Sequence, residues 1–155
     1  MKIMIIIIAT VFIFMTTASI FVCKRRKTLE KERLKKGITS QMFFDYFLEK
    51  GVDQKLCKVV YEYFQEWMHY PVWPFGKKIE SFPVMPQDDI GKIYEIYLET
   101  LDDAILEILA RYQNIPVKNV DVTNIPEATI QTIDDLVMAL WKQANSQPGK
   151  AKPAK

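Results

Sequence analysis

Residues 3–23 read IMIIIIATVFIFMTTASIFVC and contain no charged side chain. At a rise of about 1.5 Å per residue, a helix of this length nearly spans the roughly 30 Å of hydrocarbon in a bilayer. A cleaved secretory signal is the competing interpretation, but its apolar core usually has only roughly 7–15 residues. We therefore predict that residues 1–23 form a transmembrane anchor.

Basic residues follow the apolar run. Eight of them lie within residues 24–36, whereas only Lys2 and the amino group lie on the other side. Because basic flanks stay in the cytoplasm, this asymmetry predicts a single-pass membrane protein whose C-terminal domain is cytoplasmic. Residues 24–36 are predicted to form a basic juxtamembrane spacer that continues the helix and ends at Gly37. The candidates for contact with anionic lipid headgroups at the membrane surface are Lys24, Arg25, Arg26 and Lys27.

Charge divides the chain into three parts. Residues 1–36 carry a net charge of +7, residues 37–145 one of −8 and residues 146–155 one of +3. The excess of carboxylates in the central part repels phosphate, so we expect no nucleic-acid binding. Residues 146–155 are rich in lysine and proline, a composition typical of a disordered tail.

Four amphipathic stretches lie within residues 37–145. In each of them apolar side chains recur every three or four positions, the spacing of one helix face. The stripes cover residues 43–48, 56–68, 101–112 and 133–141. Residues 70–87 are rich in proline and aromatic side chains, and we expect this loop to pack on the helices. These patterns predict an all-α fold, in which one transmembrane helix precedes a four-helix bundle.

Capping signals mark the ends of the predicted helices. Thr100 followed by Asp103, and Thr132 followed by Asp135, each match a capping box in which aspartate replaces glutamate. Gly51 is placed to end the helix that begins at Thr39 or Ser40. Between the last two helices we expect at most one short helical turn, near residues 126–129.

No residue set stands out as catalytic. His69 is the only histidine, so a histidine-paired nucleophile or a multi-histidine metal site would rest on that one residue. The acidic pairs Asp88–Asp89 and Asp134–Asp135 suit first turns of helices, where they complement the dipole rather than act as general acid and base. We therefore expect no enzyme activity and no metal.

Several elements of residues 88–142 share a pattern with a known family. They are an acidic turn with a glycine at 89–91, the sequence Glu99-Thr100-Leu101-Asp102, an Ile115-Pro116 step, and a final helix opening at Thr132. The region resembles the acyl carrier protein family, whose second helix begins with Asp-Ser-Leu-Asp. The helix of residues 54–68 would correspond to the family's first helix. The resemblance implies that residues 37–145 form an acyl-carrier-protein-like four-helix bundle.

The resemblance also bears on cofactors. The family carries phosphopantetheine on the serine that heads its second helix, and Thr100 occupies that place here. The β-methyl group of a threonine crowds attack by its hydroxyl, and the family's modifying enzymes select serine. We therefore expect no cofactor. The alternative is an atypical acyl or phosphopantetheine carrier, or an accessory subunit of a membrane lipid or acyl-transfer enzyme, with the prosthetic group on Thr100.

The side of this helix opposite its core stripe is acidic. It carries Glu99, Asp102, Asp103, Leu106 and Glu107. In the resembling family basic partner enzymes recognise such a face, although a solvated acidic face with one tolerated leucine is the simpler interpretation. We predict a membrane-anchored, non-catalytic interaction module that presents this face to a basic surface of a cytoplasmic protein. A small subunit whose main role lies in the bilayer is a third hypothesis.

Overall fold

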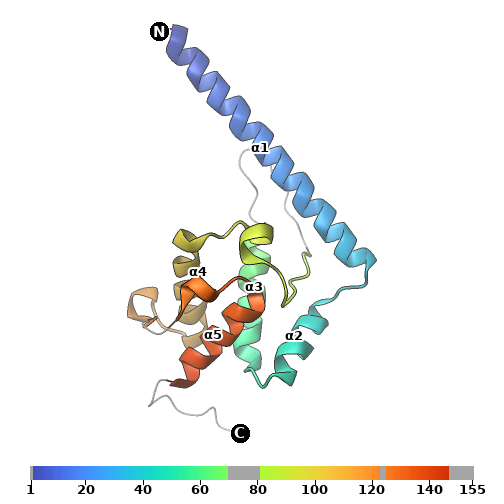
Figure 1. The fold of residues 1–155 in the computed structure, drawn as a ribbon, viewed down its shortest axis with the longest axis vertical. Helices are drawn as coiled ribbons and strands as arrows, with labels where there is room; N and C mark the ends of the chain where they lie inside the picture. The colour runs from blue at the N-terminus through green and yellow to red at the C-terminus, as the bar shows by residue number, and fades with distance from the viewer. Residues whose placement is uncertain (1, 70–80, 123–124, 147–155) are drawn as a thin grey trace. The chain divides into compact units, whose positions relative to one another are not determined.

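The computed structural model describes residues 2–69, 81–122 and 125–146. This part of the chain is mostly helical and forms no β-strand (Figure 1). It divides into two compact units, unit 1 within residues 1–39 and 65–83, and unit 2 within residues 40–64 and 84–155. The predicted all-α class is confirmed. The predicted tail, apart from Ser146, lies outside the described residues.

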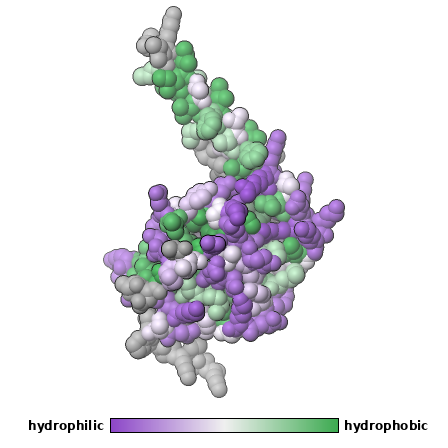
Figure 2. Space-filling view, in the orientation of Figure 1, coloured by the Kyte–Doolittle hydropathy of each residue, from purple (hydrophilic) through white to green (hydrophobic). Residues whose placement is uncertain are grey.

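The helix α1 spans Lys2–Lys35 without interruption. It is long and apolar enough to cross a membrane. Its apolar side chains are exposed, Phe14 to 74% and Phe21 to 71%, and Figure 2 shows hydrophobic side chains along it. Large exposed apolar surfaces are unfavourable in water, so α1 suits a lipid environment.

Gly37 ends α1, as the sequence predicts. Its φ of +70° places it in the left-handed region, where a side chain would be strained. The N–H of Ile38 donates to the carbonyl of Arg33 and that of Gly37 to the carbonyl of Leu34, both at 3.0 Å. This Schellman arrangement satisfies the carbonyls that a helix end leaves unpaired.

The end of α1 is packed rather than a free spacer. Arg33 is only 7% exposed, and its guanidinium lies 4.5 Å from the centroid of the Phe82 ring. The same group donates a hydrogen bond to the carbonyl of Pro83. The backbone N–H and the hydroxyl of Ser81 also donate to Glu30, each at 3.4 Å. Residues 24–35 continue the apolar helix as predicted, and the contacts of Glu30 and Arg33 with residues 81–83 could not be inferred from local sequence.

Four further helices follow α1: α2 (Ser40–Glu49), α3 (Gln54–His69), α4 (Leu98–Gln113) and α5 (Ile133–Ser146). They match the four predicted stretches, and α3 begins in unit 2 and ends in unit 1. Three short turns join them: a π-helical turn η1 (Ile90–Tyr94), and two 3-10 turns η2 (Val117–Asn119) and η3 (Glu127–Thr129). The turn η3 was predicted, whereas η2 was not.

The core of unit 2 takes apolar side chains from each of its helices. Those fully buried include Phe43, Phe47, Leu56, Phe64, Ile105, Ile108, Leu136 and Leu140. Phe44 and Leu48, predicted on the buried face of α2, lie outside this core; Phe44 is half-buried and Leu48 is 43% exposed. The reason is that α2 packs along the narrow line of Phe43 and Phe47. In the predicted packed loop, Phe82 and Val84 are buried, and residues 70–80 lie outside the described part.

The first turn of α5 contains the predicted capping box. The N–H of Thr132 donates to the carboxylate of Asp135 at 2.9 Å, and the N–H of Asp135 donates to the hydroxyl of Thr132 at 3.2 Å. Burial raises the pKa of Asp135, but the hydrogen bonds from Thr132 and Gln131 outweigh burial, and the net pKa is lowered. The carboxylate is therefore held in its charged form at the helix N-terminus.

Asp88 differs from its predicted role. Its neighbour Asp89 caps η1 as expected and accepts from the N–H of Lys92 at 2.8 Å. Asp88, however, is buried, and its carboxylate accepts from the Tyr94 hydroxyl at 2.7 Å. Its backbone carbonyl accepts from the N–H of Ile133 at 3.1 Å. Asp88 thus joins η1 to the start of α5 instead of complementing a helix dipole.

Two neighbouring substitutions test the orientation of α4. Ile105 is fully buried, whereas Leu106 is half-buried on the opposite side. We expect Ile105→Asp to lower the free energy of unfolding by about 4 kcal/mol or more, because it buries an unpaired charge. Leu106→Asp should lower the free energy of unfolding by only about 1 kcal/mol, because it removes a leucine side chain that is only partly buried. Chemical denaturation of both variants measures the difference, and a reversed order would contradict the buried face.

Candidate functional site

The start of α4 lies two residues before the predicted start. The helix begins at Leu98, with Tyr97 as its N-cap residue, so Thr100 occupies the third helical position rather than the cap. The Thr100 hydroxyl accepts from the N–H of Tyr97 at 3.1 Å and donates to the carbonyl of Tyr97 at 3.0 Å. This is the bond that the third residue of a capping box makes back to the cap. Asp103, predicted for that position, lies in the next turn.

The Thr100 side chain is exposed, yet its hydroxyl is engaged. Its proton points to the carbonyl of Tyr97, and one of its lone pairs accepts the N–H of the same residue. A nucleophilic attack by this hydroxyl would give up the bond that it donates to the carbonyl of Tyr97. The geometry gives Thr100 a structural role.

The predicted acidic face lies on the surface of α4. Glu99, Asp102 and Asp103 are exposed, and Leu106 and Glu107 are half-buried. Glu107 is paired, since its carboxylate lies 2.6 Å from the guanidinium of Arg111. The face that remains open to a partner therefore consists of Glu99, Asp102, Asp103 and Leu106.

Two apolar side chains extend this face, and sequence reasoning missed them. Tyr97 is 67% exposed and Leu98 is 63% exposed. Both precede Thr100, where the sequence predicts that the helix starts, so the predicted helical surface includes neither of them. Their position in the sequence directly before Glu99 and Thr100 was the feature that could have indicated that they belong to this face. The α4 face thus combines exposed apolar and acidic groups.

The acidic face includes crowded carboxyl groups. Protonated Glu127 in η3 donates a hydrogen bond to the side chain of Asp102, and this bond, burial and the charge of Asp102 together raise the pKa of Glu127. Two carboxyl groups this close disfavour simultaneous ionisation.

The four candidate membrane-surface residues are not equivalent. Lys24 and Arg25 are exposed and Lys27 is half-buried, but Arg26 is only 8% exposed. Arg26 is thus the least accessible of the four, and contact of these residues with lipid headgroups stays a prediction.

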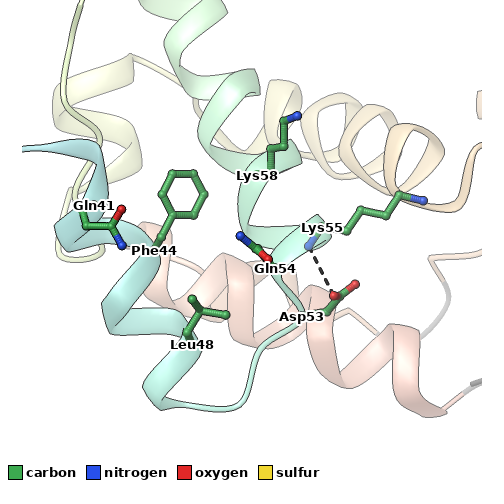
Figure 3. A pocket seen from close by; sticks show the side chains of 7 residues that line it. All are labelled: Gln41, Phe44, Leu48, Asp53, Gln54, Lys55 and Lys58. Atoms are coloured by element: carbon green, nitrogen blue, oxygen red, sulfur yellow. Dashed lines mark hydrogen bonds between the residues drawn. The ribbon is translucent and has the colours of Figure 1, made fainter. Parts of the chain in front are cut away.

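A groove of about 630 Å³ lies between α2 and the start of α3. Phe44 and Leu48 project into it from α2, and Lys58 lines it from α3 (Figure 3). The remaining lining residues are Gln41, Asp53, Gln54 and Lys55. The two apolar side chains that α2 leaves out of the core thus form one wall of a concave surface.

Comparisons of the chain with protein-family models, with curated proteins and with solved structures gave no match. Its function is therefore inferred from the chemistry of its own residues.

Substitution of Thr100 tests its structural role. We expect Thr100→Ala to lower the free energy of unfolding by about 0.5–1.5 kcal/mol, because the bond to Tyr97 is lost. Thr100→Ser keeps the hydroxyl and should differ from the wild type by less than about 0.5 kcal/mol. Urea denaturation distinguishes them. Equal losses in both variants would show that the methyl group, rather than the hydroxyl, stabilises the turn.

The crowded carboxyl pair predicts a pH dependence. Since the folded state raises the pKa of Glu127, it favours the protonated form, and that stabilisation is lost as pH rises through the raised pKa. We expect Asp102→Asn to return this pKa toward its ordinary value of 4.5. The variant should then be more stable than the wild type at about pH 7 but not at about pH 3, where Glu127 is protonated.

NMR titration of Glu127 and urea denaturation at the two pH values measure this effect. Asp103→Asn is the matched control, and it should leave the Glu127 pKa raised. An unchanged Glu127 titration in Asp102→Asn would contradict the pairing.

Proposed function

We propose that this chain is a membrane-anchored, non-catalytic interaction module, and that α4 presents its acidic face to a basic surface of a cytoplasmic protein. The observation that carries the proposal is the exposed set of Glu99, Asp102 and Asp103, flanked by the apolar side chains of Leu98 and Leu106. Charged groups steer a partner of opposite charge, and apolar groups beside them add burial on contact.

Anchoring is supported by α1. Its apolar surface suits lipid, and Lys24 and Arg25 are exposed directly after the apolar run. The excess of basic residues on this side of the run favours a single-pass orientation with α2–α5 in the cytoplasm. A partner at the membrane surface would then meet the module at a high local concentration.

The domain that carries the face is proposed to be an acyl-carrier-protein-like bundle. The proposal is supported by the order of α3, α4 and α5 along the chain, which agrees with the order that the resemblance expects for the family's first, second and final helices. The engaged hydroxyl of Thr100 supports a module without phosphopantetheine, since it stabilises the first turn of α4. In this reading the domain keeps the recognition face and lacks the carrier function.

Site-specific photo-crosslinking tests the proposal. A photoreactive amino acid at position 98 of the full chain in native membranes should yield a protein adduct. The charge reversal Asp102→Lys with Asp103→Lys should reduce that adduct about tenfold or more, because like charges across an interface cost several kcal/mol. The matched control is position 117, since Val117 is also exposed and apolar but lies on η2. It should yield no such adduct.

Two results would overturn the proposal. Equal adducts at positions 98 and 117 would remove the special role of the α4 face. An intact mass that shows phosphopantetheine on the wild type, absent from Thr100→Ala, would replace the interaction module with a carrier.

A further inference from the structure

The groove between α2 and α3 has two walls of different chemistry. Phe44 and Leu48 lie four residues apart on α2, and Lys55 and Lys58 lie three residues apart on α3. Residues at these spacings occupy successive turns on the same side of a helix. Phe44 and Leu48 thus give the groove an apolar wall on successive turns of α2, and Lys55 and Lys58 border it from α3, with the Lys55 side chain extending away from α2 (Figure 3). An apolar wall of two turns with cations at its border suits a third helix.

The groove carries a net positive charge, because the charged residues that line it are Lys55, Lys58 and one carboxylate, Asp53. One carboxylate oxygen of Asp53 accepts from the N–H of Lys55 at 3.3 Å and the other from the hydroxyl of Tyr112 at 3.0 Å. The ammonium of Lys58 lies 3.8 Å from Glu62 in an exposed pair, a weak interaction. Among the described residues, Lys55 forms no ion pair, and its ammonium lies 5.4 Å from the Tyr112 ring.

The required occupant is a helix whose exposed face alternates leucine and carboxylate. The outer face of α4 has this composition. Leu98 and Asp102 are one turn apart, and Asp103 and Leu106 follow at the spacing of the same face. Leu98 can enter the apolar side of the groove while Asp102 and Asp103 meet the lysines.

We propose that the groove of one chain binds the α4 face of a second copy, so that the chains associate head to tail. The inference rests on the proposed function, because it names a second copy as the partner of the acidic face. The two surfaces are different, so each bound chain keeps a free groove at one end and a free α4 face at the other. Such a contact is heterologous and builds rings or open rows. Anchoring of the chains in one membrane would promote this association, because it raises the effective concentration of each chain for the next.

Disulfide trapping tests the pairing directly. The full chain is reconstituted in phosphatidylcholine vesicles with Cys23→Ser, and carries either Gln54→Cys in the groove or Glu99→Cys on α4. Cys57 can remain, because it is buried and burial raises the pKa of its thiol to about 11. We expect a disulfide dimer when the two variants are mixed and none from either variant alone, since a head-to-tail contact joins groove to face.

Charge reversal adds a matched test. Lys55→Glu with Lys58→Glu in the groove variant should reduce the disulfide dimer about tenfold or more. Asp102→Lys with Asp103→Lys on the α4 variant should then restore it, because opposite charges meet again. The control reversal, Lys118→Glu with Lys142→Glu, changes the same number of charges at exposed positions outside the groove and should leave the dimer unchanged.

The outcomes separate this inference from the proposed function. If the mixture forms no more dimer than the single variants, or if the reversals have no effect, the second copy is not the partner. An adduct of a different protein at position 98 in native membranes would then leave the proposed function standing. If position 98 captures neither a second copy nor another protein, both proposals fail.

Discussion

The carboxylate of Asp88 is 3% exposed and accepts hydrogen bonds from the Tyr94 hydroxyl at 2.7 Å and the Met85 N–H at 2.9 Å. A buried carboxylate is costly unless it is hydrogen-bonded, so this group fixes the segment around it. Its backbone carbonyl accepts a hydrogen bond from the N–H of Ile133. The ring of Tyr94 packs edge-on against the ring of Phe64, with 4.7 Å between the ring centroids. One residue thereby joins η1, α3 and the start of α5.

The position of α4 follows from this constraint. Only residues 95–97 separate η1 from α4, so fixing η1 also fixes where the helix begins. The early start places Tyr97 and Leu98 at the head of the acidic face, and it uses the hydroxyl of Thr100 within the first turn. The chemistry proposed for α4 thus depends on a buried polar contact several residues away, because that contact decides which side chains share the exposed face.

Much of the helical pattern and part of the site could be predicted from particular residues. Ile105 repeats with its neighbours at the spacing of a buried helix face, and Asp102 and Asp103 fall on the opposite side as expected. The resemblance to acyl carrier proteins, the partner and the topology stay predictions. The groove beside Phe44 could not be predicted, because periodicity places Phe44 on the same face as Phe43 and cannot show that only a narrow line of α2 is covered.

The sequence by itself determined the long apolar helix and its end at Gly37, and the capping box of Thr132 and Asp135, since each depends on composition or on contacts within about five residues. Only the tertiary structure decided the burial of Asp88 and the packing of Arg33 on Phe82. The physical reason is sequence separation: Arg33 finds its partner 50 residues away at Pro83, and neither propensity nor periodicity carries information over that distance.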